Sequence, residues 1–199
     1  MEHPKNDSNN YIQRHWKDIL IPAISLAIIC VVVALAVSGT HALTANRIAM
    51  QQELALSNAM GRLIVAERYE IVLEDEDGEP VIYAAITAED LVEGHLFLTS
   101  SCGYSSYVLV LTAIKDGVVL GIDIVDASGE TPGLGQNILH ESFTNEFRDL
   151  TVAPLLVRDV PREQGEIQSL TGATISADAV VQAVAKAMEL YNEHILSNN

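Results

Sequence analysis

The chain has 199 residues, with 27 acidic and 11 basic side chains and a formal net charge of −16. This length allows one domain with its own core plus an accessory segment, and so strong a negative charge argues against nucleic acid as a partner. The two cysteines and six histidines show no spacing typical of a disulfide framework or a metal site, so we predict neither. We expect Cys102 to be a small buried residue.

One apolar stretch predicts a membrane anchor. Residues 19–37, ILIPAISLAIICVVVALAV, carry no charge, and at the helical rise they reach about 28 Å, close to the thickness of a bilayer core. We predict a single transmembrane helix here. A cleaved signal peptide is the alternative, with Ala34-Leu35-Ala36 as its small-residue cleavage site, although the apolar run is longer than a signal peptide usually has.

Basic residues around this stretch predict its orientation. Lys5, Arg14 and Lys17 come before it, whereas only Arg47 follows within the next twenty residues. Lys and Arg gather on the cytoplasmic side of membrane helices. We therefore expect residues 1–18 in the cytoplasm and the bulk of this single-pass protein on the extracytoplasmic face of the cell (inner) membrane.

Residues 38–66 are expected to form a stalk. Within them, residues 41–62 are rich in Ala, Leu, Gln and Met and contain no Pro, which favours a helix that continues out of the membrane. Residues 67–197 then form the extracytoplasmic domain.

The pattern changes to strands after the stalk. The runs RYEIVLE (68–74) and VIYAAI (81–86) are rich in strand-forming residues and are separated by turn residues. Asp116-Gly117, between YVLVLTAI and VVLGIDIV, predicts a hairpin over 107–125. Its first strand is apolar enough to be covered on both faces, and its second strand, with Asp123, should have a wetter face. We therefore predict an α+β fold with an antiparallel sheet.

Two helices are predicted in the rest of the domain. A tight loop at 129–135 precedes a helix over about 137–149, which is followed by a short strand over 152–157. The last element is a C-terminal helix that Ser176 can cap. Its apolar face is formed by Val180, Ala183, Val184, Ala187 and Tyr191.

The stretch SLTGATISAD (169–178) leaves a hydroxyl unobstructed. Thr174 lies just before the predicted helix, beside its free amide hydrogens and positive dipole end, where an anionic group is stabilised. Gly172 and Ala173 leave room for a large group. The alternative is that these hydroxyls only cap the helix and bind no ligand. Likewise ETPGLGQ (130–136) is by itself a tight turn, because it fits no standard phosphate-binding pattern.

Together the two stretches resemble a known family. GETPGLGQ, about forty residues before TGAT and with Gly103-Tyr104 ahead of the hairpin, is similar to the FMN-binding domain of the G subunit of the Rnf electron-transport complex. The C subunit of the sodium-pumping NADH:quinone reductase is a relative, and the resemblance covers residues 60–195. It implies that FMN is attached to Thr174 through a phosphoester bond. It also implies that Thr171, Gly172 and Ala173 complete the attachment motif and that the flavin is contacted by Tyr104, Glu130, Thr131, Gly133, Leu134 and Gly135.

The resemblance further implies an electron-carrying component of an ion-translocating ferredoxin:NAD oxidoreductase. Its expected partners are the other Rnf subunits and a flavin transferase. FMN carries the redox chemistry, and no catalytic constellation for a reaction of the chain alone is visible. The length favours the Rnf protein over its quinone-reductase relative. A covalent bond also suits so acidic a domain, because the domain would retain a free, doubly charged FMN poorly.

Several residues admit two interpretations. Arg158 and Arg162 either neutralise the flavin phosphate or are solvated surface arginines. Three apolar or aromatic residues either contact the flavin ring or belong to the core: Tyr104, Leu134 and Phe143. Gln168 stands where the family usually has an acidic residue, with Glu166 two residues earlier. Two alternative functions stay open: another flavinylated extracytoplasmic electron carrier, and a membrane-tethered binding or regulatory module without a cofactor.

Overall fold

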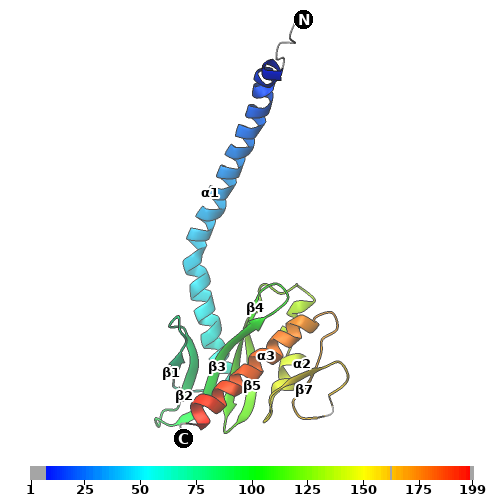
Figure 1. Cartoon of the computed structure of the whole chain (residues 1–199). Helices are drawn as coiled ribbons and strands as arrows, with labels where there is room; N and C mark the ends of the chain where they lie inside the picture. The colour runs from blue at the N-terminus through cyan, green and yellow to red at the C-terminus, as the bar shows by residue number, and fades with distance from the viewer. Residues whose placement is uncertain (1–7, 162, 198–199) are drawn as a thin grey trace, which may run out of the picture. The chain divides into compact units, whose positions relative to one another are not determined.

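The structure is a computed structural model that describes residues 8–161 and 163–197 (Figure 1). The chain divides into two compact units, residues 1–51 and residues 52–199. The first helix, α1 (Ser8–Leu63), begins in the first unit and ends in the second.

The first unit carries the apolar part of α1. Ile19–His41 is a stretch of 23 residues with a mean hydropathy of 3.0, long and apolar enough to cross a membrane, and it contains the predicted span. The hydroxyl of Ser25 donates to the carbonyl of Ile21 at 2.8 Å, so this polar group is satisfied within the helix. The helix predicted over residues 41–62 is confirmed, since α1 continues to Leu63 without a break.

A five-stranded antiparallel sheet forms the centre of the second unit. Each strand pairs with the next one along the chain. The Asp116-Gly117 turn has positive φ at both residues, 52° and 78°, as the tight turn of a two-residue hairpin requires, so the predicted hairpin is confirmed. In chain order the strands are β1 (Arg68–Glu74), β2 (Pro80–Ile86), β3 (Val92–Cys102), β4 (Tyr107–Lys115) and β5 (Val118–Asp126).

The central strand, β3, has no counterpart among the predicted elements. Gly94, His95 and the serines near the end of the strand interrupt the alternation of apolar and polar residues that marks a strand. Pairing with β2 along the first half of β3 and with β4 along most of its length stabilises the strand. Such pairing depends on neighbours in space, which a local pattern does not contain.

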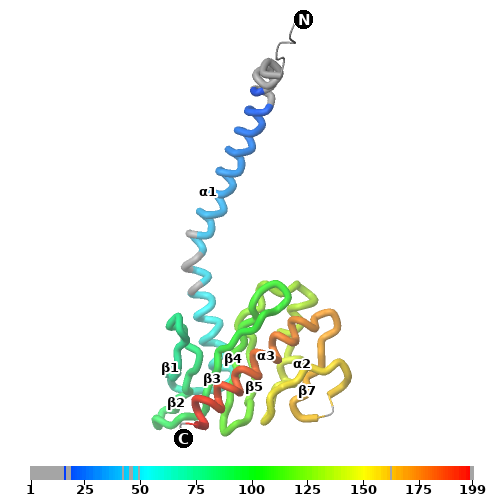
Figure 2. The backbone as a smooth tube through the Cα atoms, in the orientation of Figure 1, coloured from blue at the N-terminus to red at the C-terminus, as the bar shows by residue number. Residues whose placement is uncertain are grey.

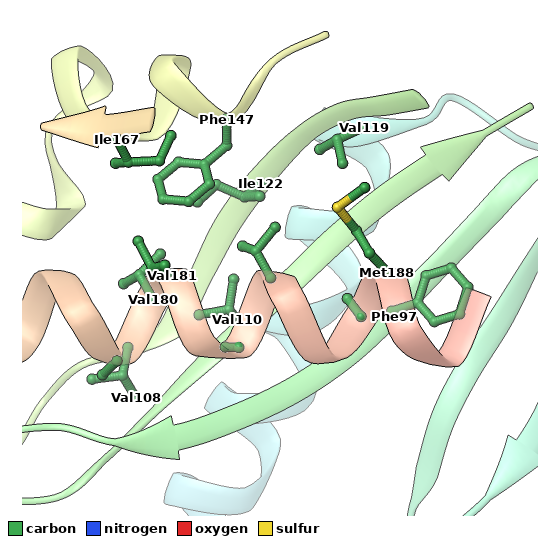
Figure 3. Packing of buried hydrophobic residues seen from close by; sticks show 14 of the residues in the cluster. Phe97, Val108, Val110, Val119, Ile122, Phe147, Ile167, Val180, Val181 and Met188 are labelled. Carbon is green, nitrogen blue, oxygen red and sulfur yellow. The ribbon is translucent and has the colours of Figure 1, made fainter. Parts of the chain in front are cut away.

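Helices cover both faces of the sheet. α3 (Thr174–Tyr191) lies against one face and buries a large apolar cluster with side chains of β3, β4 and β5 (Figure 3). On the other face, the end of α1 contributes Ala59 and Met60 to a second cluster with Leu96 and Leu111. β4 is therefore covered on both faces, as its composition predicts.

Asp123 of β5 is half-buried, with 19% of its side chain exposed. Its Oδ2 accepts a hydrogen bond from Nε of Arg62 at 2.6 Å, which links β5 to the end of α1. This hydrogen bond raises the pKa of the Arg62 guanidinium above its ordinary value. Because Arg62 is largely exposed, the pair contributes little to stability.

The connection between β5 and α3 contains short elements rather than the single helix predicted over 137–149 (Figure 2). His140 has extended backbone angles, φ −72° and ψ 139°, which interrupt the helix. The break allows Ile138 and Phe143, which are five positions apart, both to reach the core. The short helices here are η1 (Gly135–Leu139), α2 (Glu141–Thr144) and η2 (Asn145–Phe147), and η3 (Asn192–Leu196) follows α3.

A second, two-stranded sheet completes the domain. It consists of β6 (Leu155–Val157) and β7 (Glu166–Gln168), which run parallel. β6 confirms the strand predicted near 152–157, although it is shorter, and β7 is not among the predicted elements. β7 leads directly into the segment that precedes α3, so this small sheet positions the TGAT motif.

Candidate functional site

Thr174 is the first residue of α3, and it is exposed. Ala173 occupies the N-cap position with φ −129°, and no side chain caps the helix. The prediction that Ser176 caps the helix is therefore wrong: Ser176 lies within the first turn and is 2% exposed. Because the first amides of a helix have no acceptors within it, the positive end of α3 lies beside the Thr174 hydroxyl.

A cavity of about 510 Å³ opens beside Thr174. Three segments that are far apart in the sequence form its wall, namely the loop after β3, residues 131–135 and the start of α3. Its volume lies within the range of small-molecule sites, about 300–1,000 Å³. The lining residues are Tyr104, Thr131, Leu134, Gly135, Gly172, Ala173, Thr174, Ile175 and Ser176.

Most residues predicted for the site line this cavity, and three do not. Gly133 has a φ of 72° and forms the turn of its loop, Thr171 is exposed next to the wall, and Glu130 lies behind it. Two wall residues, Ile175 and Ser176, are absent from the prediction. Their place in the first turn of a helix that begins at Thr174 is the signal that could have identified them.

Exposed apolar side chains line the cavity. Tyr104, Leu134 and Ile175 are 67%, 45% and 53% exposed. Large apolar side chains gathered around a hollow are typical of a binding site, because a bound planar ring would bury their surface. Phe143, in contrast, is 1% exposed, and its ring centroid lies 5.4 Å from that of Phe147, so it belongs to the core.

Glu130 is buried behind the cavity wall, with 1% of its surface exposed. Its Oε1 accepts a hydrogen bond from the backbone N–H of Tyr104 at 2.9 Å, and its Oε2 accepts one from the hydroxyl of Ser176. One carboxylate thus joins the loop after β3, its own loop and the first turn of α3. A buried carboxylate requires such donors, because burial without them costs desolvation free energy.

Glycines provide the space that this arrangement needs. A Cβ on Gly103 would overlap Oε1 of Glu130, and a Cβ on Gly135 would lie 2.8 Å from Oε2. Gly172 has a φ of 79°, and a Cβ there would lie 2.9 Å from Cδ1 of Leu134. The glycines of the motifs are therefore required for close approach at the site as well as for turns.

Thr174 also lines a second cavity, of about 310 Å³. Arg158 and Asp178 contribute side chains of opposite charge to its wall, and Ser169 donates a hydrogen bond to Oγ1 of Thr174 at 3.2 Å. Arg158 is thus a cation that the fold brings into the neighbourhood of Thr174. Arg162, the other arginine considered, lies outside the described residues.

The position of Cys102 differs from the one that the sequence predicts. Cys102 is exposed at the end of β3, so the prediction that it is buried is wrong. The last pair of β3 and β4, Cys102 with Tyr107, lies at the margin of the sheet, where the strand ends. In the part of the chain that the structure describes, no three His, Cys, Asp or Glu side chains are grouped as a metal site requires.

Two protein families match the chain. Residues 103–189 match the FMN-binding domain, and residues 10–63 match the RnfG N-terminal region. The first match begins at the loop after β3 and includes every segment of the cavity wall.

Relatives extend the similarity along most of the chain. The G subunit of the proton-translocating ferredoxin:NAD(+) oxidoreductase complex of Clostridium ljungdahlii is 30% identical over 168 aligned residues, which cover 83% of this chain and 87% of the relative. The G subunit of the Na(+)-translocating ferredoxin:NAD(+) oxidoreductase complex of Acetobacterium woodii is 27% identical, covering 93% of this chain and 97% of the relative. Among solved structures, the C subunit of the Na(+)-translocating NADH-quinone reductase of Parabacteroides distasonis is 18% identical, covers 57% of this chain and 61% of its own, and has a TM-score of 0.48.

Proposed function

Because the chain belongs to the G-subunit family of ion-translocating (Rnf) oxidoreductase complexes, we propose that it carries electrons through an FMN attached to Thr174 by a phosphoester bond. Membership of the family makes the chain a membrane flavoprotein with an FMN-binding domain. One observation supports the attachment site: ETPGLGQ and TGAT, which are separate in the sequence, meet at a single cavity that Thr174 lines.

The residues around the cavity suit FMN. Tyr104, Leu134 and Ile175 offer apolar surface to a planar ring. An ester at Thr174 would carry its phosphate at the positive end of α3, and Arg158 offers a positive charge in the neighbouring cavity. Polar and apolar groups are thus distributed as an amphipathic cofactor requires.

In the proposed attachment, Thr174 supplies the oxygen that joins the protein to the flavin. With FAD as donor and a flavin transferase, Oγ1 replaces AMP on the phosphorus next to the riboflavin part, and the hydroxyl proton is released. The protein then gains the mass of FMN less water. Ser169, which donates a hydrogen bond to Oγ1, orients this oxygen. When bound, FMN supplies reversible electron transfer, and the apolar side chains hold the ring and exclude water.

We place this activity in an Rnf complex, with the chain as one electron relay between reduced ferredoxin and NAD and with the other Rnf subunits as partners. Complexes of this kind contain the relatives from Clostridium ljungdahlii and Acetobacterium woodii. In the proposed topology, residues 1–18 are cytoplasmic, α1 crosses the cell (inner) membrane once through the apolar stretch Ile19–His41, and the flavin domain is extracytoplasmic.

The test of attachment is the intact mass and in-gel fluorescence of the denatured full chain, expressed with and without a flavin transferase. We expect wild type to gain FMN less water only with the transferase, and Thr174→Val to gain nothing. Thr151→Val is the matched control, because it removes an exposed threonine hydroxyl outside both motifs and should keep the adduct. An adduct on Thr174→Val would contradict the assigned site, and no adduct on wild type with an active transferase would favour a module without a cofactor.

Topology is tested with the exposed thiol of Cys102. A membrane-impermeant maleimide should label wild type in intact cells whose outer barrier has been removed, and Cys102→Ser should remain unlabelled. Labelling that appears only after the membrane is permeabilised would reverse the proposed orientation.

A further inference from the structure

Glu130 differs from every other charged side chain in the described part of the protein. It is the only Asp, Glu, Lys or Arg there that is buried. The salt bridges found among the described residues join other groups, so none of the described cations is paired with Glu130. A buried acid without a counter-ion is expensive to keep, which suggests a role beyond packing.

Dipoles rather than a cation stabilise this carboxylate. Each oxygen accepts one hydrogen bond, from the Tyr104 amide and from the Ser176 hydroxyl. Ser176 is the third residue of α3, so Glu130 also lies at the positive end of that helix. The Tyr104 amide can only donate and the Ser176 hydroxyl can donate, so both contacts suit a carboxylate, which only accepts.

The Glu130 carboxylate does not line the cavity itself but is hydrogen-bonded to two residues that do. Both of its donors, Tyr104 and Ser176, belong to residues of the cavity wall. Gly103 and Gly135 leave the space that the two oxygens occupy, because a side chain at either position would collide with one of them. The two glycines therefore leave room for the carboxyl group of Glu130 directly behind the cavity wall.

We propose that Glu130 is a positioning residue whose negative charge lowers the reduction potential of the flavin bound in this cavity, an inference that rests on the proposed function. Reduction adds negative charge to a flavin, and a nearby fixed charge without a counter-ion opposes that addition. The same carboxylate fixes the Tyr104 loop and the first turn of α3, so it sets both the shape and the potential of the site.

The test is a spectroscopic redox titration of the flavinylated full chain and its variants. Glu130→Gln keeps the shape and an acceptor for the Tyr104 amide but removes the charge. It should favour the reduced flavin about tenfold, a rise in potential of about 30 mV for a two-electron couple. Glu130→Asp keeps the charge on a shorter side chain. Its potential should stay near that of wild type, whereas hydrogen exchange of the Tyr104 amide in the flavin-free protein should become faster.

Glu189→Gln is the matched control. Glu189 is an exposed carboxylate near the far end of α3. Its replacement by glutamine removes one negative charge from the domain, as Glu130→Gln does, but does not alter the cavity. This variant should leave the potential unchanged. If Glu130→Gln does not fold, Ser176→Ala replaces it: removal of one donor leaves the charge less compensated, and the potential should fall.

The outcomes separate the two proposals. A wild-type chain that takes up no FMN contradicts the proposed function and, with it, this inference. A flavinylated wild type combined with an unchanged or lowered potential in Glu130→Gln contradicts the inference alone. An unchanged or raised potential in Ser176→Ala would do the same.

Discussion

The hydroxyl of Ser169 donates a hydrogen bond to Oγ1 of Thr174, with 3.2 Å between the two oxygens. Ser169 is half-buried and Thr174 is exposed, so the bond holds a surface hydroxyl in one orientation. It uses a lone pair of Oγ1 and leaves the hydrogen of the Thr174 hydroxyl free for removal. We expect Ser169→Ala to lower the rate of FMN attachment about fivefold, the effect of one neutral hydrogen bond of about 1 kcal/mol.

This rate is the initial increase of in-gel flavin fluorescence with FAD and a purified transferase. Ser142→Ala, an exposed serine on α2, is the control and should react as wild type does. Equal rates for Ser169→Ala and wild type would show that the hydrogen bond does not orient the attacking oxygen.

Gln168 presents an exposed side chain six residues before Thr174, at the end of β7. Its backbone N–H is held by Oε2 of Glu146 at 2.8 Å, so the position is ordered while the side chain faces solvent. The resemblance to the family implies an acidic residue at this position. We therefore expect Gln168→Glu to raise the rate of FMN attachment about thirtyfold, the effect of one charge-assisted hydrogen bond of about 2 kcal/mol.

Gln182→Glu is the matched control for this change, since it adds the same charge at an exposed glutamine of α3. The same fluorescence assay measures both variants. An equal acceleration in both would point to general charge, and no acceleration in Gln168→Glu would exclude recognition of this position by the transferase.

A comparison of alanine variants at Gly172 and Gly117 distinguishes the effect of backbone strain from that of steric contact at the cavity. Both have positive φ, 79° and 78°, but a Cβ at Gly117 meets nothing within 4 Å, whereas one at Gly172 lies 2.9 Å from the tip of Leu134. Leu134 is partly exposed and can rotate away. Alanine at either position should therefore cost about 1–2 kcal/mol of unfolding free energy. Only Gly172→Ala should also slow FMN attachment, because Leu134 would move at the cavity wall.

Urea unfolding and the attachment assay check this pair. A normal attachment rate in Gly172→Ala, at the expected loss of stability, would show that the position of Leu134 does not matter for the site.

Thr112 and Thr99 form a second pair, in the core. Thr112 is fully buried, and its hydroxyl has no hydrogen-bond partner among the described residues. The hydroxyl of Thr99 donates to the carbonyl of Ala183 at 2.8 Å and joins β3 to α3. We expect Thr112→Val to raise the free energy of unfolding by about 1 kcal/mol and Thr99→Val to lower it by a similar amount. Urea unfolding at constant pH measures both, and a destabilised Thr112→Val would contradict the absence of a partner.

His95 predicts a pH-dependent stability. Burial lowers the pKa of this imidazole below its ordinary value of 6.5, and its ring lies beside that of Tyr191, with centroids 6.5 Å apart. The unfolded chain therefore binds a proton at a higher pH than the folded chain does. His95 consequently reduces stability as the pH falls through about 6.5 and has no such effect well above it.

The variant that tests this is His95→Gln. The difference in free energy of unfolding, variant minus wild type, should increase as the pH is lowered from about 7.5 to 5.5. A constant difference between the two proteins over this range would contradict the lowered pKa.

Features that depend on neighbouring residues along the chain could be predicted from the sequence. The apolar stretch at 19–37, the Asp116-Gly117 hairpin and the C-terminal helix follow from hydropathy, turn chemistry and helical period, which are local properties. Thr174 could be singled out in the same way, because small residues and a hydroxyl before a helix form a local motif.

Long-range packing decided the remaining features. β3 is a strand because β2 and β4 pair with it, and the predicted helix over 137–149 breaks so that Ile138 and Phe143 both reach the core. Ser176 turns inward to Glu130 instead of capping α3, which no pattern within either motif reveals. The sequence thus determines which chemical groups are present. The burial of Glu130 and the meeting of three distant segments around one cavity exist only once the chain has folded, because burial depends on neighbours in space.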